Sequence, residues 1–233
     1  TRYQTAMEVA NALKEELGVS KFETVIIATG IDYPDALAGS YLAGKKNAPI
    51  LMVNERYMDD VANYVRNNVV AGGKVYILGG DKAVSPVLET KLSGYNIERL
   101  AGSNRFETNL LILEEAKVTN EDILICTGYD FADSLSASAT ERPILLVHPK
   151  SGLNAKQKEF LNNVRGNKMY VIGGVNAVND DIYNRIINKS YIENDSIKLE
   201  DLVYIKFLHF DFNNNVKEGE LIINRKIKDN IIN

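Results

Sequence analysis

The chain contains the same four short sequence blocks twice, in the same order. The recurring pairs are Arg2-Tyr3-Gln4-Thr5 with Arg105-Phe106-Glu107-Thr108, 29–37 with 127–135, Pro49-Ile50-Leu51 with Pro143-Ile144-Leu145, and Ile77-Leu78-Gly79-Gly80 with Val171-Ile172-Gly173-Gly174. The offset between the copies falls along the chain from 103 to 98 to 94 residues, which indicates two short deletions in the second copy. Each copy exceeds the period of solenoid repeats and is large enough for its own core. The sequence therefore predicts two modules, 1–98 and 99–187, followed by a tail, 188–233.

Within each copy, helical and strand signals alternate. Apolar residues at helical spacing predict helices, and continuous β-branched apolar runs predict strands buried on both faces. The expected helices are 4–17, 34–44, 58–69 and 84–92, and the expected strands are 24–29, 48–53, 74–78, 122–127, 143–148 and 168–172. This alternation predicts an α/β fold of two tandem flavodoxin-like or Rossmann-like modules with parallel sheets. In the short β-rich tail we expect strands at 203–212 and 220–223, and a helix from Arg225.

The composition excludes several classes of protein. The chain has 233 residues, 45% of them hydrophobic, and its net charge of -4 is spread evenly. No segment has the positive excess of a nucleic-acid binder. No apolar run reaches the ~18 residues of a membrane span. The sequence shows no signal peptide, but it opens inside a repeat block, so we expect the first module to lack its opening residues.

The residues that could support catalysis or hold a cofactor are few. The glycine pairs at 79–80 and 173–174 follow buried strands, but neither copy has G-x-G-x-x-G or a P-loop lysine, so we expect no nucleotide cofactor. Cys126 lies in an apolar run and is expected to be a small buried hydrophobe, because Ala28 stands at its position in the first copy. His148 and His209 have no metal-binding spacing, so we expect no metal site and no complete catalytic site.

Two carboxylates three residues apart recur in both copies, Asp32 with Asp35 and Asp130 with Asp133. They have two open interpretations. A pair of acids could serve catalysis, or Asp35 and Asp133 could cap the helix that follows, where negative charge is favoured. The second interpretation is the simpler one.

Arg2 and Arg105 each stand at the start of a predicted helix, where the helix dipole gives a cation no benefit. A charge kept in both copies at such a place indicates a fixed carboxylate partner. We expect Arg2 to pair with Asp35 and Arg105 with Asp133, each within its own module and within ~4 Å, the range of an ion pair.

Several of these blocks together resemble the type 2 cell wall-binding repeat of Gram-positive surface proteins. They are 104–108, Asp32-Tyr33-Pro34-Asp35-Ala36-Leu37-Ala38, Pro49-Ile50-Leu51, Tyr76-Ile77-Leu78-Gly79-Gly80 and Arg99-Leu100-Ala101-Gly102. The resemblance covers residues 1–187. It implies flavodoxin-like modules that hold a secreted protein non-covalently on the cell wall through an anionic polymer, without being enzymes themselves. Modules of this family usually come in threes and pack as a triangle, so the resemblance implies a third repeat module or self-association.

The tail resembles the segment that precedes the catalytic core in zinc peptidases of the D-alanyl-D-alanine carboxypeptidase family. The resemblance rests on 202–205, 210–212, Gly219-Glu220-Leu221-Ile222-Ile223-Asn224 and Ile227. It implies that the chain is the anchor portion of a peptidoglycan-cleaving enzyme whose zinc ligands lie after Asn233. A tether would raise the effective concentration of such an enzyme at its substrate.

An acidic chain can bind an anionic polymer only through local clusters of positive charge. Lys45-Lys46 is the strongest cluster, in the loop before the strand at Pro49, and Arg142 is its only counterpart in the second copy. Lys45, Lys46 and Arg142 are therefore the candidate polymer-binding residues. The alternative from another class is a small-molecule-binding α/β domain that uses the carboxyl ends of its parallel strands.

Overall fold

The computed structural model describes residues 1–130, 132–164, 168–174, 177–180, 183–184, 204–210 and 216–222. The chain divides into two compact units, Thr1–Lys117 and Val118–Asn233. This division falls after helix α6 (Arg105–Glu115), which is the first helix of the second repeat. The first unit therefore contains the first repeat and the opening helix of the second one.

The first unit is built on a four-stranded parallel sheet with the strand order β2-β1-β3-β4. The strands are β1 (Phe22–Thr29), β2 (Ile50–Val53), β3 (Val69–Leu78) and β4 (Asn96–Leu100). Each parallel connection contains a helical segment, as a parallel sheet requires. An order that starts 2-1-3-4 is that of flavodoxin-like sheets.

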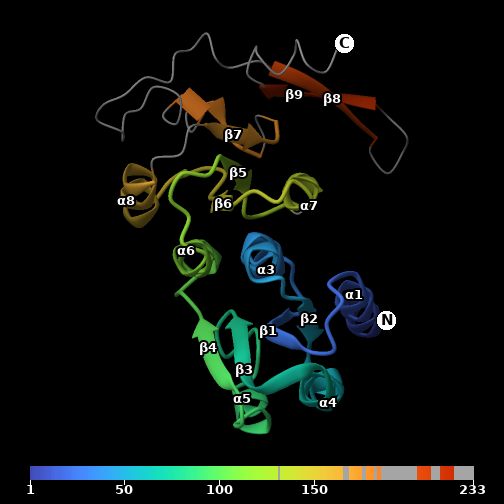
Figure 1. Ribbon diagram of the computed structural model, residues 1–233. Coiled ribbons are helices and arrows are strands. Elements are labelled where there is room, and N and C mark those ends of the chain that lie inside the picture. The colour runs from blue at the N-terminus through green and yellow to red at the C-terminus, as the bar shows by residue number, and fades with distance from the viewer. Residues whose placement is uncertain are drawn as a thin grey trace. The chain divides into compact units, whose positions relative to one another are not determined.

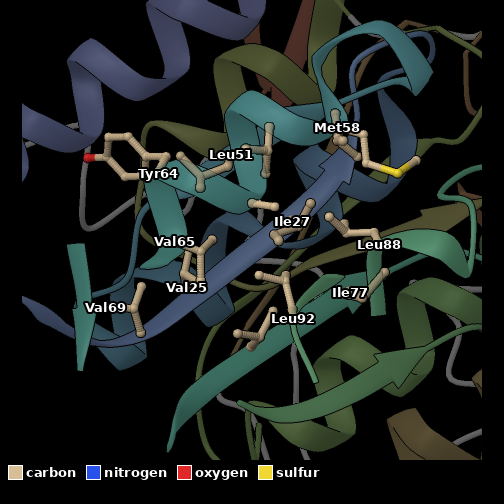
Figure 2. Packing of buried hydrophobic residues seen from close by; sticks show 14 of the residues in the cluster. Val25, Ile27, Leu51, Met58, Tyr64, Val65, Val69, Ile77, Leu88 and Leu92 are labelled. Atoms are coloured by element: carbon tan, nitrogen blue, oxygen red, sulfur yellow. The ribbon is translucent and has the colours of Figure 1, made fainter. Parts of the chain in front are cut away.

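Helices cover both faces of this sheet (Figure 1). They are α1 (Arg2–Glu16), α2 (Pro34–Ala38), α3 (Ser40–Lys46), α4 (Met58–Asn68), α5 (Val87–Lys91) and α6, with a 3₁₀ turn η1 (Glu55–Tyr57) before α4. Because successive residues of a strand point to opposite faces, β1 supplies both cores. Val25 and Ile27 belong to a core shared with α1, α4 and α5, shown in Figure 2 with Leu51, Val65 and Leu88. Ile26 and Ala28 point to the opposite face of the sheet and are also fully buried.

The second unit repeats the central part of this arrangement. Its parallel strands β5 (Ile123–Thr127), β6 (Ile144–Val147) and β7 (Met169–Ile172) lie in the order β6-β5-β7, the counterpart of β2-β1-β3. Its helices are α7 (Ala132–Ser138) and α8 (Ala155–Asn163). The predicted α/β class with two parallel-sheet modules is confirmed. The strand β8 (Tyr204–Phe210) pairs antiparallel with β9 (Val216–Ile222), and the helix expected from Arg225 lies outside the described residues.

Two features of the first unit differ from the sequence prediction. The helix expected over 34–44 is two helices, α2 and α3, that meet at Gly39. A Cβ at Gly39 would lie 2.5 Å from Cδ1 of Leu78, so the glycine lets the backbone approach β3 closely. Strand β4 was not predicted, because its sequence Asn-Ile-Glu-Arg-Leu is only partly apolar. It is an edge strand whose Arg99 bonds Glu89 at 2.7 Å.

Candidate functional site

In flavodoxin-like sheets, ligands bind at the carboxyl ends of the strands, where the strand order reverses. In the first unit, side chains of the chain itself occupy this region. The ring of Tyr3 lies directly against Gly30, the residue after β1, and stacks on Tyr57 with 4.4 Å between ring centroids. Nδ2 of Asn54, the residue after β2, donates to the Tyr3 hydroxyl at 2.8 Å. This region is therefore closely packed by the module's own residues.

A carboxylate packs against the turn after the third strand in both modules. Asp35 lies against Gly79, which has φ +97°, and Asp133 lies against Gly173, which has φ +121°. A Cβ on Gly173 would come within 2.6 Å of Oδ2 of Asp133. Glycine is required here both for the backbone conformation and for the space that the carboxylate fills. This supports the backbone interpretation of the glycine pairs.

Asp35 is not the N-cap residue of α2, although it lies in the first turn of that helix, where negative charge is favoured. The N-cap of α2 is Tyr33, which makes no side-chain cap hydrogen bond, and Pro34 and Asp35 are the first two residues of the helix. Burial raises the pKa of Asp35, the nearby Asp32 carboxylate raises it further, and the Arg105 guanidinium lowers it. Asp35 is thus a half-buried carboxyl group held between the helix and the Gly79 turn.

Arg2 and Arg105 both lie in the first unit and contact partners that the sequence did not predict. Nη1 of Arg2 donates to the backbone oxygen of Gly30 at 2.8 Å, and the expected Arg2–Asp35 ion pair is not formed. Nη2 of Arg105 lies 3.5 Å from Oδ2 of Asp32, in the turn of the first repeat. Arg105 belongs to the first unit and Asp133 to the second, so their predicted ion pair stays a prediction.

Lys45 and Lys46 form the last turn of α3, where the helix dipole favours positive charge. Nζ of Lys46 lies 3.6 Å from a carboxylate oxygen of Glu115 in α6 and 5.9 Å from the ring centroid of Tyr76. Nζ of Lys45 lies 5.5 Å from the ring of Tyr41 in the same helix. The two lysines therefore differ, because Lys46 joins α3 to α6 through Glu115.

Tyr76 of β3 lies among the charged side chains of Lys46, Glu115 and Lys74. It was not among the candidate site residues predicted from the sequence. Its ring is buried, its hydroxyl donates to Oε1 of Glu115, and Nζ of Lys74 lies 5.0 Å from its ring centroid. Lys74 in turn pairs with Glu98 of β4 at 2.6 Å. Burial raises the pKa of the Tyr76 hydroxyl, and its hydrogen bond to Glu115 raises the pKa further.

A matching group surrounds Tyr170 in the second unit. The guanidinium carbon of Arg142 lies 5.1 Å from the Tyr170 ring centroid, and Nη2 of Arg142 lies 3.9 Å from Oδ2 of Asp122. The Tyr170 hydroxyl donates to Asp122 at 3.4 Å. Each module thus holds positive charge beside the tyrosine of its third strand, from Lys46 and Lys74 in the first unit and from Arg142 in the second. The sequence carried the signal, because a tyrosine precedes the apolar pair and glycine pair in both copies.

The remaining candidates for chemistry are structural. Cys126 is fully buried, and burial raises the pKa of its thiol, so it is a poor nucleophile. Nδ1 of His148 accepts the backbone N–H groups of Lys150 and Ser151 at 3.1 and 3.2 Å. The described residues contain no cluster of His, Cys, Asp and Glu that could hold a metal ion.

The sequence pattern of one family, cell wall binding domain 2, matches residues 1–89 and 99–183. The two matches cover both repeats and most of the chain. The chain belongs to the cell wall binding domain 2 family. Its two repeats are therefore cell wall-binding modules, and their function is to hold a protein on the wall.

Characterised and solved relatives agree with this assignment. The chain is 28% identical over 194 residues to the N-acetylmuramoyl-L-alanine amidase LytC of Bacillus subtilis, covering 79% of this chain and 37% of the amidase. Among solved structures it is similar to Cwp8 from Clostridium difficile, with a TM-score of 0.70, 29% identity, and coverage of 81% of this chain and 32% of Cwp8. Cwp6 from Clostridium difficile gives a TM-score of 0.66, 25% identity, and coverage of 81% and 30%.

The chain spans only about a third of the length of these relatives. What it shares with them is the pair of wall-binding modules. No helix among the described residues is long and apolar enough to span a membrane.

Proposed function

We propose that the two wall-binding modules hold a larger extracellular protein on the cell wall by binding an anionic wall polymer through local positive charge. The observation that carries the proposal is the match of both repeats to one wall-binding family. The rival interpretation, a small-molecule site at the strand ends, has less support because Tyr3 packs against Gly30 in that region of the first unit.

The chain carries a net charge of -4, so attraction to an anionic polymer depends on groups such as Lys45, Lys46 and Arg142. Glu115 partly neutralises Lys46, and Asp122 partly neutralises Arg142. Lys45 and Lys46 are both exposed at the end of α3, and because Glu115 holds Lys46 we expect Lys46 to contribute less of its charge to polymer binding. The two modules would then contribute unequally.

A sedimentation assay with purified cell walls tests this function. The chain is mixed with intact walls and with walls from which the anionic polymer has been extracted, and the bound fraction is measured after centrifugation. We expect retention on intact walls and loss on extracted walls. Equal retention on both would contradict polymer binding while leaving wall binding in place.

The lysine contribution is tested by Lys45→Gln over a salt series. Because fewer counterions are released when one cation is removed, the variant should bind more weakly at low salt and with a shallower salt dependence. Lys82→Gln is the matched control, because Lys82 is an exposed lysine that follows the carboxyl end of β3, whereas Lys45 precedes the amino end of β2. Equal effects of the two substitutions would show only a general charge effect.

We also propose that this anchor serves a catalytic domain elsewhere in the full protein, since one relative of the modules is an amidase. Tethering to the wall would raise the effective concentration of such a domain at peptidoglycan. The hairpin of β8 and β9 is the segment in which we predicted a zinc peptidase lead-in. Release of peptidoglycan fragments by the full-length protein, measured with and without a chelator, tests this: activity that the chelator leaves unchanged would contradict a zinc peptidase.

A further inference from the structure

The residue that follows the second strand of each module closes a turn with its side chain. In the first module, Oδ1 of Asn54 accepts the backbone N–H of Tyr57 at 3.0 Å. In the second module, Nδ1 of His148 accepts the backbone N–H of Ser151 at 3.2 Å. The repeat offset of 94 residues makes Asn54 the counterpart of His148, and Tyr57 the counterpart of Ser151. The two modules therefore close the same turn with chemically different acceptors.

The two acceptors respond differently to pH. The amide oxygen of an asparagine does not titrate, whereas a histidine nitrogen accepts a hydrogen bond only in the neutral ring. Histidine is the side chain whose ordinary charge change falls between pH 5 and 8. When the imidazole takes its second proton, both ring nitrogens become donors. The group that closes the turn of the second module would then face its partners as donor against donor.

His148 holds more than one backbone group in this turn. Its Nδ1 also accepts the N–H of Lys150, at 3.1 Å. The N–H of Gly152 returns to the His148 carbonyl at 2.9 Å, and Gly152 is buried with φ +68°. Glycine adopts this backbone conformation without a steric penalty. A proton on Nδ1 would therefore oppose two N–H groups at once, in a turn that is tightly folded.

The surroundings of His148 connect the turn to the rest of the second module. Tyr129, after β5, lies edge-on to the imidazole with 5.2 Å between the ring centroids. From the segment after β7, Nδ2 of Asn179 donates to the Pro149 carbonyl at 3.1 Å. A change in the turn therefore reaches the residues that follow all three strands of this sheet.

The charged groups near the turn favour its opening when His148 becomes a cation. Lys150 is exposed in the turn itself, only two residues from His148, so a protonated imidazole adds a second positive charge there. The carboxylate of Asp133, on α7 at the same edge of the sheet, packs against Gly173. Like charges in one short turn repel each other, and this repulsion adds to the loss of the acceptor.

We infer that the turn 148–152 is a pH-sensitive switch, closed while His148 is neutral and opened when its ring takes a second proton. The turn after β2 stays closed over the same pH range, because Asn54 does not titrate. The second module thus changes at the carboxyl edge of its sheet in mildly acidic conditions, and the first module does not. The switch concerns the backbone of one module, so it does not depend on polymer binding.

Amide hydrogen exchange of the whole chain, followed residue by residue by NMR, tests the switch. Protection factors, corrected for the intrinsic effect of pH on exchange, are compared on the two sides of the histidine range, at about pH 7.5 and about pH 5. We expect the protection of Lys150 and Ser151 to fall about two- to tenfold, as for the loss of one ordinary hydrogen bond. The N–H of Tyr57 is the internal control and should keep its protection. Constant protection at Ser151, or an equal fall at Tyr57, would overturn the inference.

His148→Asn gives the second module the acceptor of the first. This variant should keep the protection of Ser151 near neutral pH and lose most of its pH dependence. His209→Asn is the matched control, because it removes the other histidine of the chain, and it should respond to pH as the wild type does. A pH response that survives in His148→Asn, or that disappears in His209→Asn, would contradict the role of His148.

The titration of the imidazole identifies the group that drives the change. The proton resonance of Cε1 in His148 reports the charge of the ring, and the amide resonances of Lys150 and Ser151 report the turn. All three should change with one midpoint. A separate midpoint for the amides would mean that another group opens the turn, and would overturn the switch. This comparison uses the wild-type chain, so it stays decisive even if His148→Asn folds poorly.

Discussion

Nη2 of Arg105 lies 3.5 Å from Oδ2 of Asp32, so the arginine that opens the second repeat pairs with the aspartate of the first. The same helix brings Glu115 to Tyr76 and Lys46. The packed unit consequently ends at Lys117, whereas the repeat ends near residue 98. The repeat boundary and the boundary of the packed unit are therefore different places in this chain.

We predict that a fragment of residues 1–117 is more stable than a fragment of residues 1–103, which keeps the whole of β4. The shorter fragment lacks α6 and so exposes Leu37 and Tyr76. A loss of several kcal/mol is expected, because burying one large apolar side chain stabilises by about 1.5–3 kcal/mol. Urea unfolding of both fragments, followed by circular dichroism, measures the difference. Equal midpoints would mean that α6 contributes nothing to the first unit.

We predict that Gly79→Ala destabilises the first unit by about 1–3 kcal/mol, the range for a residue forced into an unfavourable backbone region. Gly79 has φ +97°, and the added Cβ would also meet the Asp35 carboxylate. Gly80→Ala is the control, because nothing lies within 4 Å of its Cβ position and its φ is not in the positive range. Thermal unfolding of the two variants compares them; a similar loss in both would contradict the close packing at Gly79.

We predict a pH-dependent effect of Asp35→Asn. Burial raises the folded-state pKa of Asp35 above the ordinary value of 3.8, so the folded state holds the proton more tightly than the unfolded state. The contribution of this group to stability is therefore greatest below pH 3.8 and is lost as the pH rises through the folded-state pKa. Relative to the wild type, Asp35→Asn should gain stability over that interval. Unfolding curves measured across the acidic range test this, and a constant difference between the two proteins would refute it.

We predict that Lys45 and Lys46 separate into a binding and a structural role. Lys46→Gln removes the half-exposed ion pair with Glu115 and should lower the stability of the first unit by about 0.2–1 kcal/mol, as expected for such pairs. Lys45→Gln should weaken wall binding and leave stability nearly unchanged. Denaturation and wall sedimentation are measured on both variants. The assignment is wrong if Lys46→Gln affects only binding and Lys45→Gln affects only stability.

The sequence by itself determined the repeat, the α/β class and most of the strands. Runs such as Val25 to Ala28 are apolar throughout because both faces of a parallel strand are buried, and this property is local enough to read from composition. The strands β8 and β9 were also predicted from local sequence, as two β-rich runs separated by three asparagines. The repeat also predicted the family, and it marked Arg2, Arg105 and the aspartates as residues with fixed surroundings.

Only the tertiary structure decided which partners these residues meet. Arg105 contacts Asp32 because α6 packs on the preceding module, and no local pattern specifies on which module a helix packs. Asp35 lies on Gly79, and Arg2 bonds the Gly30 carbonyl, although the retention of both residues in the two copies had suggested that their side chains pair with each other. Periodicity records how deeply a residue is buried, whereas the choice of a partner depends on segments far apart in the chain, which only folding brings together.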